Sequence, residues 1–169
     1  MLPPEILLHV WNQHADRLLL IVRGFGEPAE DAVQEAFVRL AAQDVVPEET
    51  LAWLVRVARN QLLQWWRSDA RSRRRELERG KATEWFAEGM LDDALDAATV
   101  AAGLRQLSEG SRATLMMHIW GSLSFEQIAV ILGVSRSTAH RQYMRAMEQL
   151  RVRFQPSKNL LNEPPDHES

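Results

Sequence analysis

The sequence predicts an all-α protein made of two small helical domains joined by an acidic linker. Three observations support this fold class. Apolar residues recur at helical spacing through most of the 169 residues, and the alternation typical of strands is nearly absent. Two short helices joined by a tight turn are predicted within residues 124–146. Acidic and basic residues are segregated into separate blocks of the chain.

Three amphipathic helices are expected in the first domain, residues 1–76. A segment with two glycines and a proline separates the first helix from the second, and a loop precedes the third. The approximate spans of these helices are 5–22, 29–42 and from residue 50 into an arginine-rich run. Thr50 is placed to cap the third helix.

The second half of the chain is expected to hold a linker, a helical domain and a tail. Residues 77–98 are predicted to be an acidic linker with some helical tendency, because five acidic residues and no basic residue occur between Glu84 and Asp96. Residues 99–155 form the second domain. The tail, residues 156–169, cannot bury much apolar surface and is expected to be disordered.

The second domain contains the most informative stretch of the chain. Ser124 with Gln127 forms a capping box at the start of one helix, and Gly133 supplies the tight turn after it. Ser135 is placed to cap the next helix, which carries arginine, serine and histidine side chains. Such a helix can enter a major groove and meet bases and phosphates. The alternative is an ordinary helical hairpin with a basic face.

The composition is compatible with nucleic-acid binding despite a net charge of −3. Nine basic residues and only three acidic ones lie between Arg56 and Lys81, and five arginines follow Val134. The chain has no cysteine, no apolar run long enough to span a bilayer and no signal peptide at its start. A cytoplasmic protein without membrane insertion is expected.

Catalysis by the chain is not expected. The sequence holds no Gly-rich phosphate loop and no His-Glu-x-x-His motif. His9 and His14 are five residues apart and do not align on one helical face, and the pair Asp92 and Asp93 lies in the acidic segment. We therefore predict no metal site and no cofactor.

Two blocks of the sequence together resemble the extracytoplasmic-function (ECF) class of bacterial sigma-70 family RNA polymerase sigma factors. The first block comprises residues 29–40 and 51–60 and the arginines that follow, and it is similar to the family's region 2. The second runs from residue 104 through the helix-turn-helix to Arg151 and is similar to region 4. The resemblance implies a region 2 bundle of three to four helices and a region 4 helix-turn-helix domain.

The resemblance also implies three groups of binding residues. The group expected to bind core polymerase is Asp31, Gln34, Glu35 and Arg39, although an acidic helix face without this context would be interpreted as solvated. The group expected at the downstream promoter element is Asn60, Gln64, Arg67 and Arg71, which share one face of the third helix. The group expected at the upstream element is Arg136, Ser137, His140, Arg141 and Arg145.

Other residues have expected roles beside these groups. The loop 43–49 occupies the position that captures an unstacked base in the family. For Trp65 and Trp66 two alternatives stay open, stacking on single-stranded DNA or packing against a neighbouring element. In the recognition helix, one set is expected to face the domain core: Ala139, Tyr143, Met147 and Leu150.

By this resemblance the chain is a sigma factor that binds core RNA polymerase and directs promoter-specific transcription initiation. The implied partners are the clamp and flap regions of the polymerase, promoter DNA and an anti-sigma factor. One alternative is a sigma-like adaptor that sequesters an anti-sigma factor without directing transcription. The other is a conventional helix-turn-helix regulator, which would bind an operator without polymerase.

Overall fold

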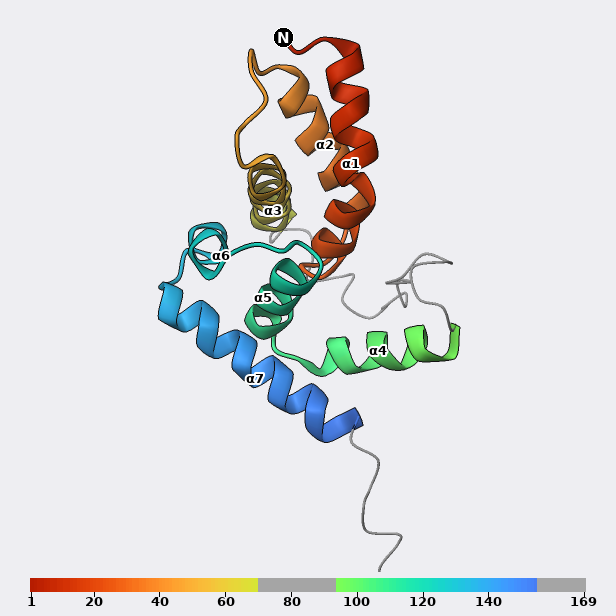
Figure 1. The fold of residues 1–169 in the computed structure, drawn as a ribbon, viewed down its shortest axis with the longest axis vertical. Coiled ribbons are helices and arrows are strands. Elements are labelled where there is room, and N and C mark those ends of the chain that lie inside the picture. The colour runs from red at the N-terminus through yellow and green to blue at the C-terminus, as the bar shows by residue number, and fades with distance from the viewer. Residues whose placement is uncertain (70–93, 155–169) are drawn as a thin grey trace, which may run out of the picture.

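A computed structural model of the chain describes residues 1–69 and 94–154, and within these ranges all regular secondary structure is helical (Figure 1). The all-α fold class predicted from the sequence is confirmed. The helices are α1 (Pro4–Arg23), α2 (Ala29–Ala41), α3 (Thr50–Asp69), α4 (Ala94–Gln106), α5 (Glu109–Ile119), α6 (Phe125–Leu132) and α7 (Arg136–Phe154).

Helices α1, α2 and α3 pack around one apolar core. Each helix presents its apolar stripe to the other two, and the side chains of Leu18, Leu40 and Leu54 are fully buried where the stripes meet. The observed spans of α1 and α2 agree with the sequence prediction to within one residue at each end. Thr50 does not cap α3 as predicted: it is the first residue of the helix, and its hydroxyl donates a 2.7 Å hydrogen bond to the carbonyl oxygen of Pro47.

The turn between α1 and α2 brings the end of α3 against it. Gly26 has a φ of 135°, and a Cβ there would lie 3.1 Å from the Trp66 ring. The indole nitrogen of Trp66 donates a 3.0 Å hydrogen bond to the carbonyl oxygen of Glu27. Trp65 and Trp66 are half-buried and pack against the apolar core. The structure therefore favours the packing alternative for both tryptophans.

Helix α4 begins at Ala94, five residues before the predicted start of the second domain. The segment 94–98 holds three alanines, which favour helix, whereas the acidic residues before and within it suggested a linker. Helix α4 packs on the far end of α7, where Leu104 and Leu107 are buried together with Ala146. The linker residues up to 93 and the tail from 155 lie outside the described residues.

The helix-turn-helix is formed by α6 and α7, and its local hydrogen bonds are those predicted. The Ser124 hydroxyl accepts from the backbone N–H of Gln127 at 3.2 Å, and the Gln127 side-chain oxygen accepts from the Ser124 N–H at 2.8 Å. Gly133 ends α6 with a φ of 68°, in the left-handed region. The Ser135 hydroxyl accepts from the N–H of Thr138 at 3.1 Å.

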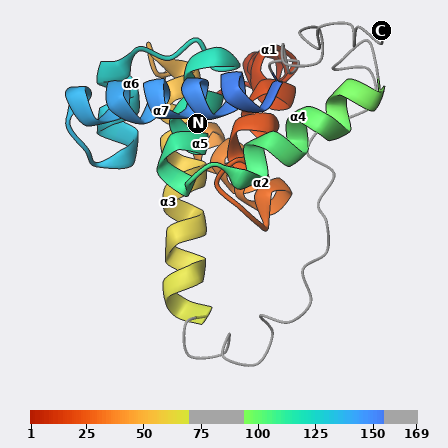
Figure 2. The ribbon, with the colours of Figure 1, turned by 90° about the horizontal axis from the view of Figure 1, so that it is seen from below.

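The first three helices also pack against the helix-turn-helix, as the ribbons in Figures 1 and 2 show for α3 and α6. One continuous apolar cluster contains Leu54 of α3, Met117 of α5 and Ile128 of α6. Two arginines join helices α1–α3 to helices α5–α7, called here the helix-turn-helix half. Arg59 Nη1 donates to the carbonyl oxygen of Ile131 at 3.0 Å, and Arg112 Nε donates to the carbonyl oxygen of Gly24 at 2.9 Å. Burial lowers the pKa of both guanidinium groups.

None of the described helices combines the length and apolar character that a membrane span needs.

Candidate nucleic-acid interface

Helix α7 exposes all five residues that the sequence predicts at the upstream element. Their side chains are exposed, while Ala139 and Ala146 on the opposite side of the helix are fully buried. The five residues are Arg136, Ser137, His140, Arg141 and Arg145. Tyr143 and Leu150 are half-buried on the core side, as predicted. The prediction for Met147 is wrong, because this side chain is 40% exposed one position past Ala146, where the helix turns away from the core.

The predicted DNA-contacting side chains are held loosely by their neighbours. Arg136 forms an exposed ion pair with Glu126 at the start of α6, and Arg141 Nη2 donates a 3.2 Å hydrogen bond to the Thr138 hydroxyl. The Ser137 hydroxyl lies 3.0 Å from that of Ser135. Exposed ion pairs contribute little to stability, so these arginines can exchange their partners for phosphate at small cost.

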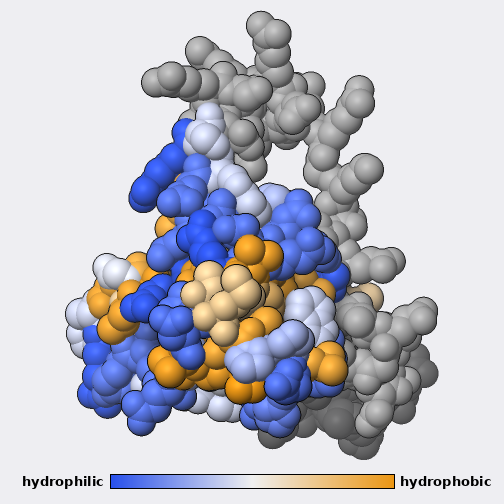
Figure 3. All heavy atoms as spheres, turned by 90° about the horizontal axis from the view of Figure 1, so that it is seen from above, coloured by the Kyte–Doolittle hydropathy of each residue, from blue (hydrophilic) through white to orange (hydrophobic). Residues whose placement is uncertain are grey.

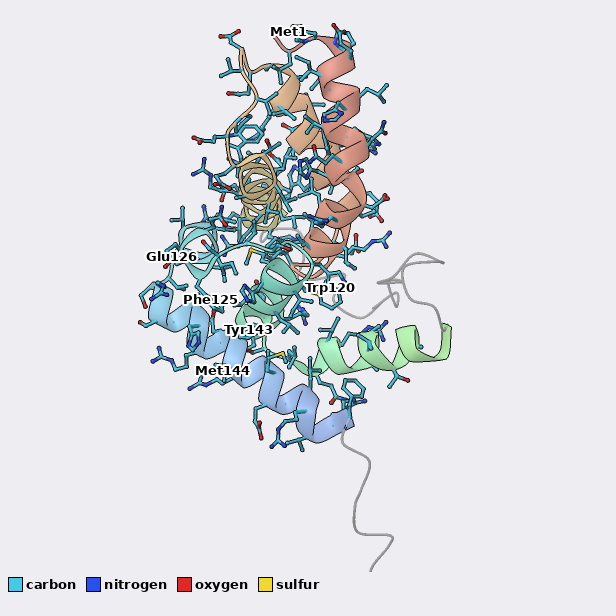
Figure 4. All side chains as sticks on the ribbon, viewed as in Figure 1. Met1, Trp120, Phe125, Glu126, Tyr143 and Met144 are labelled. Atoms are coloured by element: carbon cyan, nitrogen blue, oxygen red, sulfur yellow. The ribbon has the colours of Figure 1, made fainter. Side chains whose placement is uncertain are left out.

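Met144 is a candidate contact that the sequence prediction missed. Its side chain is 53% exposed, and it follows His140 by four residues and Arg141 by three, which places it on the same face of α7. Figure 4 labels it beside Tyr143 on this helix. An apolar side chain at this place can contact a thymine methyl group. The exposed methionine was overlooked because apolar residues in a helix usually belong to the core, although its spacing from His140 would have revealed it.

Helix α3 offers a second exposed polar face. Asn60, Gln64 and Arg67 are all exposed, whereas Arg71, the fourth member of the predicted group, lies outside the described residues. The end of α3 that carries Gln64 and Arg67 projects beyond the other helices in Figure 2. An exposed helix of this kind can accept a phosphodiester backbone along its polar face.

The loop before α3 uses its acidic side chains for contacts within the protein. Asp44 Oδ1 accepts a 2.9 Å hydrogen bond from the N-terminal amine of Met1. Glu49 Oε2 accepts one of 2.7 Å from Gln127 Nε2 on α6. Gln43 donates to the backbone carbonyl of Arg39 at 3.2 Å. The predicted base capture by this loop stays a prediction.

The polar face of α2 divides into two parts. Asp31 and Gln34 are exposed, as expected of residues that bind another protein. Glu35 instead accepts a 2.8 Å hydrogen bond from Arg39, which also donates to the buried side chain of Gln61 on α3. Arg39 nevertheless stays 42% exposed and Glu35 35% exposed, so all four predicted residues remain accessible, and their role at the polymerase stays a prediction.

Apolar side chains are exposed beside this face of α2. Figure 3 looks at the end of the molecule where α1 begins and shows hydrophobic residues among hydrophilic ones. Val38 of α2 is 63% exposed, and Leu8 and Trp11 of α1 line an apolar concavity next to Phe37. The Trp11 and Phe37 ring centroids are 4.6 Å apart. An exposed aromatic and apolar patch with polar side chains at its edge is typical of a protein-binding surface.

Within residues 1–69 and 94–154, no three histidine, aspartate or glutamate side chains lie close enough together to hold a metal ion. Among the histidines described, burial lowers the pKa of His14, whose Nδ1 atom is buried without a hydrogen-bond partner. His14 lies on α1, whereas His118 lies on α5 and His140 on α7, so these histidines come from three different helices.

The fold and these surfaces define a class of protein: an all-helical DNA-binding protein with a helix-turn-helix and a second exposed polar helix face. Family models refine this class, since "Sigma-70 region 2" matches residues 11–72 and "Sigma-70, region 4" matches residues 99–150. The chain belongs to the sigma-70 family and, within it, to the ECF class of RNA polymerase sigma factors. The resemblance stated from the sequence is confirmed.

Curated relatives support the assignment. The chain is 31% identical over 146 residues to RNA polymerase sigma-E factor of Streptomyces coelicolor and covers 78% of that protein. It is 31% identical over 149 residues to ECF RNA polymerase sigma factor SigE of Mycolicibacterium smegmatis. This second match spans 83% of the chain but only 58% of the longer relative.

Two solved structures share the fold. One is the sigma factor RpoE in complex with the anti-sigma factor NepR from Bartonella quintana, with a TM-score of 0.68 at 22% identity over 88% of this chain and 93% of that one. The other is CnrH in complex with the cytosolic domain of CnrY, with a TM-score of 0.58 at 25% identity over 89% and 88% of the two chains. The first match is evidence for the fold alone.

Proposed function

We propose that this protein binds core RNA polymerase and directs promoter-specific transcription initiation. The observation that carries the proposal is that one member of the sigma-70 family presents two separate exposed faces suited to nucleic acid, one on α3 and one on α7. A protein with only a helix-turn-helix would have no use for the first three helices. The family is one of non-catalytic initiation factors, and the chemistry of RNA synthesis belongs to the polymerase.

Each face has a separate task in this proposal. Helix α7 enters the major groove of the upstream promoter element, where arginine and histidine side chains meet bases and phosphates. The polar face of α3 meets the downstream element after strand separation, through Asn60, Gln64, Arg67 and Arg71. The polymerase clamp is met by α2, through Val38 and the predicted group Asp31, Gln34, Glu35 and Arg39. The helix-turn-helix half meets the flap.

Each of the two predicted domains carries one of these binding tasks. Residues 1–76 form the unit for core polymerase and the downstream element, and residues 99–155 form the unit for the upstream element. Residues 77–98 connect them, with α4 starting inside this connection at Ala94. Residues 156–169 form the tail. The protein acts in the cytoplasm, where its polymerase and DNA are.

An anti-sigma factor is a further partner in this proposal. The similar protein RpoE of Bartonella quintana was crystallised with the anti-sigma factor NepR. A protein whose two faces are both exposed without polymerase needs a means of being kept inactive. Sequestration by a protein partner supplies that control.

Run-off transcription of fragmented host DNA by purified core polymerase, with and without the full chain, tests the proposal. We expect new start sites that share two spaced upstream motifs. Binding to core polymerase without any such start site would instead favour an adaptor. Autonomous binding to an operator, with no affinity for core polymerase, would identify a conventional helix-turn-helix regulator.

Replacing Arg141 with alanine should weaken and relax recognition of the upstream element. If this arginine reads a guanine bidentately, the loss is about 1–3 kcal/mol for the matching promoter. Promoter binding by the reconstituted holoenzyme, measured against promoters mutated one base pair at a time, gives both affinity and selectivity. Arg151→Ala is the matched control, because Arg151 is on the same helix but is paired with Glu148. Equal behaviour of the two variants would refute the role of Arg141.

A further inference from the structure

Four aromatic rings form a cluster where α5, α6 and α7 meet. They are His118 of α5, Phe125 of α6, and His140 and Tyr143 of α7. Figure 4 labels Phe125 and Tyr143 at this meeting point. Of these four side chains, His140 is exposed and the other three are half-buried. His140 also belongs to the predicted DNA-contacting group. The cluster therefore connects the interior of the helix-turn-helix half to its recognition surface.

The inner part of the cluster is rigidly held. His118 Nδ1 lies 2.9 Å from the carbonyl oxygen of Leu123, and since that oxygen can only accept, Nδ1 carries the proton and donates. The His118 ring stacks on Phe125, with centroids 4.5 Å apart and planes 18° apart. Tyr143 meets the His118 ring edge-on at 4.8 Å and the Phe125 ring at 5.5 Å. Phe125 thus has little freedom to turn.

Phe125 connects this rigid cluster to the recognition surface of α7. Its ring meets the imidazole of His140 at 5.1 Å with an interplanar angle of 82°, an edge-to-face arrangement that aromatic rings prefer. An exposed histidine without such a neighbour would sample several rotamers, and its ring nitrogens would point in different directions. A hydrogen bond to one base edge requires a defined ring direction.

We infer that Phe125 is a positioning residue that sets the direction of the His140 imidazole and thereby the base preference at one position of the upstream element. The inference rests on the proposed function, because it requires that α7 reads promoter DNA. Phe125 itself touches no DNA in this scheme. It acts on discrimination at one base pair, whereas contacts with phosphate supply affinity that is largely independent of sequence.

A purely structural role for Phe125 predicts a different result. If the ring only filled the core, its loss would lower stability and weaken binding to every promoter by the same factor. If the ring positions His140, its loss lowers the preference for one base pair and leaves the other positions unchanged. The pattern of base preference therefore separates the two roles, which a measurement of affinity alone does not.

The test uses core polymerase with the full chain and promoters randomised across the upstream element. We expect His140→Ala to lower discrimination at one base pair by about three- to tenfold, the range of a single hydrogen bond. Phe125→Leu should lower it at the same base pair, and the double variant should be no less selective than His140→Ala alone. Phe125→Tyr keeps the ring and should retain the preference. Phe125→Met keeps apolar volume without a ring and replaces the leucine variant if that one does not fold.

Ile131→Ala is the matched control, because Ile131 is buried on α6, the helix that carries Phe125, and is not one of the four rings of the cluster. We expect this variant to lose stability but to keep the base preference. Unchanged preference in Phe125→Leu, additive losses in the double variant, or unchanged preference in His140→Ala would each overturn the inference. Failure of the wild-type protein to show any upstream preference would instead overturn the proposed function.

Discussion

Replacing Ile128 with alanine is expected to lower the free energy of unfolding by about 2–5 kcal/mol. Ile128 lies on α6 and is fully buried in the apolar cluster that also contains Leu54 of α3. The substitution leaves a cavity at the point where the helix-turn-helix packs on the first three helices. Because small proteins are stable by only about 5–15 kcal/mol, this loss is a large fraction of the total.

Urea unfolding followed by two probes measures this loss and shows whether the halves unfold together. Helical circular dichroism reports on the whole chain, whereas four of the six tryptophans lie in the first three helices: Trp11, Trp53, Trp65 and Trp66. In Ile128→Ala we expect both midpoints to fall together, since the core is continuous. The control is Val130→Ala on the same helix, whose side chain is mostly exposed and whose loss should change little. A tryptophan midpoint that stays unchanged in Ile128→Ala would show that the two halves unfold independently.

Reversing the charge of Asp31 should reduce the affinity for core polymerase at least about tenfold, because a like-charge contact in an interface costs several kcal/mol. Asp31 is exposed on the outward face of α2, close to Gln34, and makes a suitable site because its replacement disturbs no core packing. Glu35 is less suitable, since its 2.8 Å bond with Arg39 supports the contact with α3. Asp31→Lys therefore tests the interface and not the fold.

The measurement is titration of core polymerase with labelled full-length protein at fixed salt. Asp16→Lys makes the same change of charge on the exposed surface of α1 and controls for the general effect of net charge. Both variants should remain folded, although Asp31→Lys is expected to lose a little thermal stability because Asp31 lies in the first turn of α2, where an acidic side chain interacts favourably with the helix dipole. Equal affinity of the two variants for core polymerase would remove α2 from the proposed interface.

Where structure depends on neighbours in the sequence, the predictions from sequence were correct. The capping box of Ser124 and Gln127, the left-handed Gly133 and the Ser135 cap all involve residues at most three positions apart. Such hydrogen bonds depend on residue type and spacing, so the sequence contains them in full. The exposure of His140 and Arg141 follows in the same way from helical periodicity.

Where structure depends on residues far apart in the chain, the sequence was insufficient. The hydrogen bond from Arg39 to Gln61, a residue 22 positions away on another helix, could not be foreseen from the spacing within α2. Met147 was predicted to face the core but is 40% exposed, and α4 begins at Ala94, within the segment 77–98 predicted as a linker with some helical tendency. Periodicity gives the direction of a side chain around its own helix, but the position of the neighbouring helix decides whether that side is covered.

By itself, the sequence of this protein determined the helices α1, α2, α3, α6 and α7, the caps at Ser124 and Ser135 and the exposed basic face of the recognition helix, because each depends on local propensity, spacing and periodicity. It also determined the family through two blocks of matching residues. Only the tertiary structure decided that α3 and α6 share one apolar core, that Trp66 packs on Gly26 and that Phe125 meets His140 edge-on. These contacts join residues distant in the chain, and their free energy depends on how whole helix surfaces fit together.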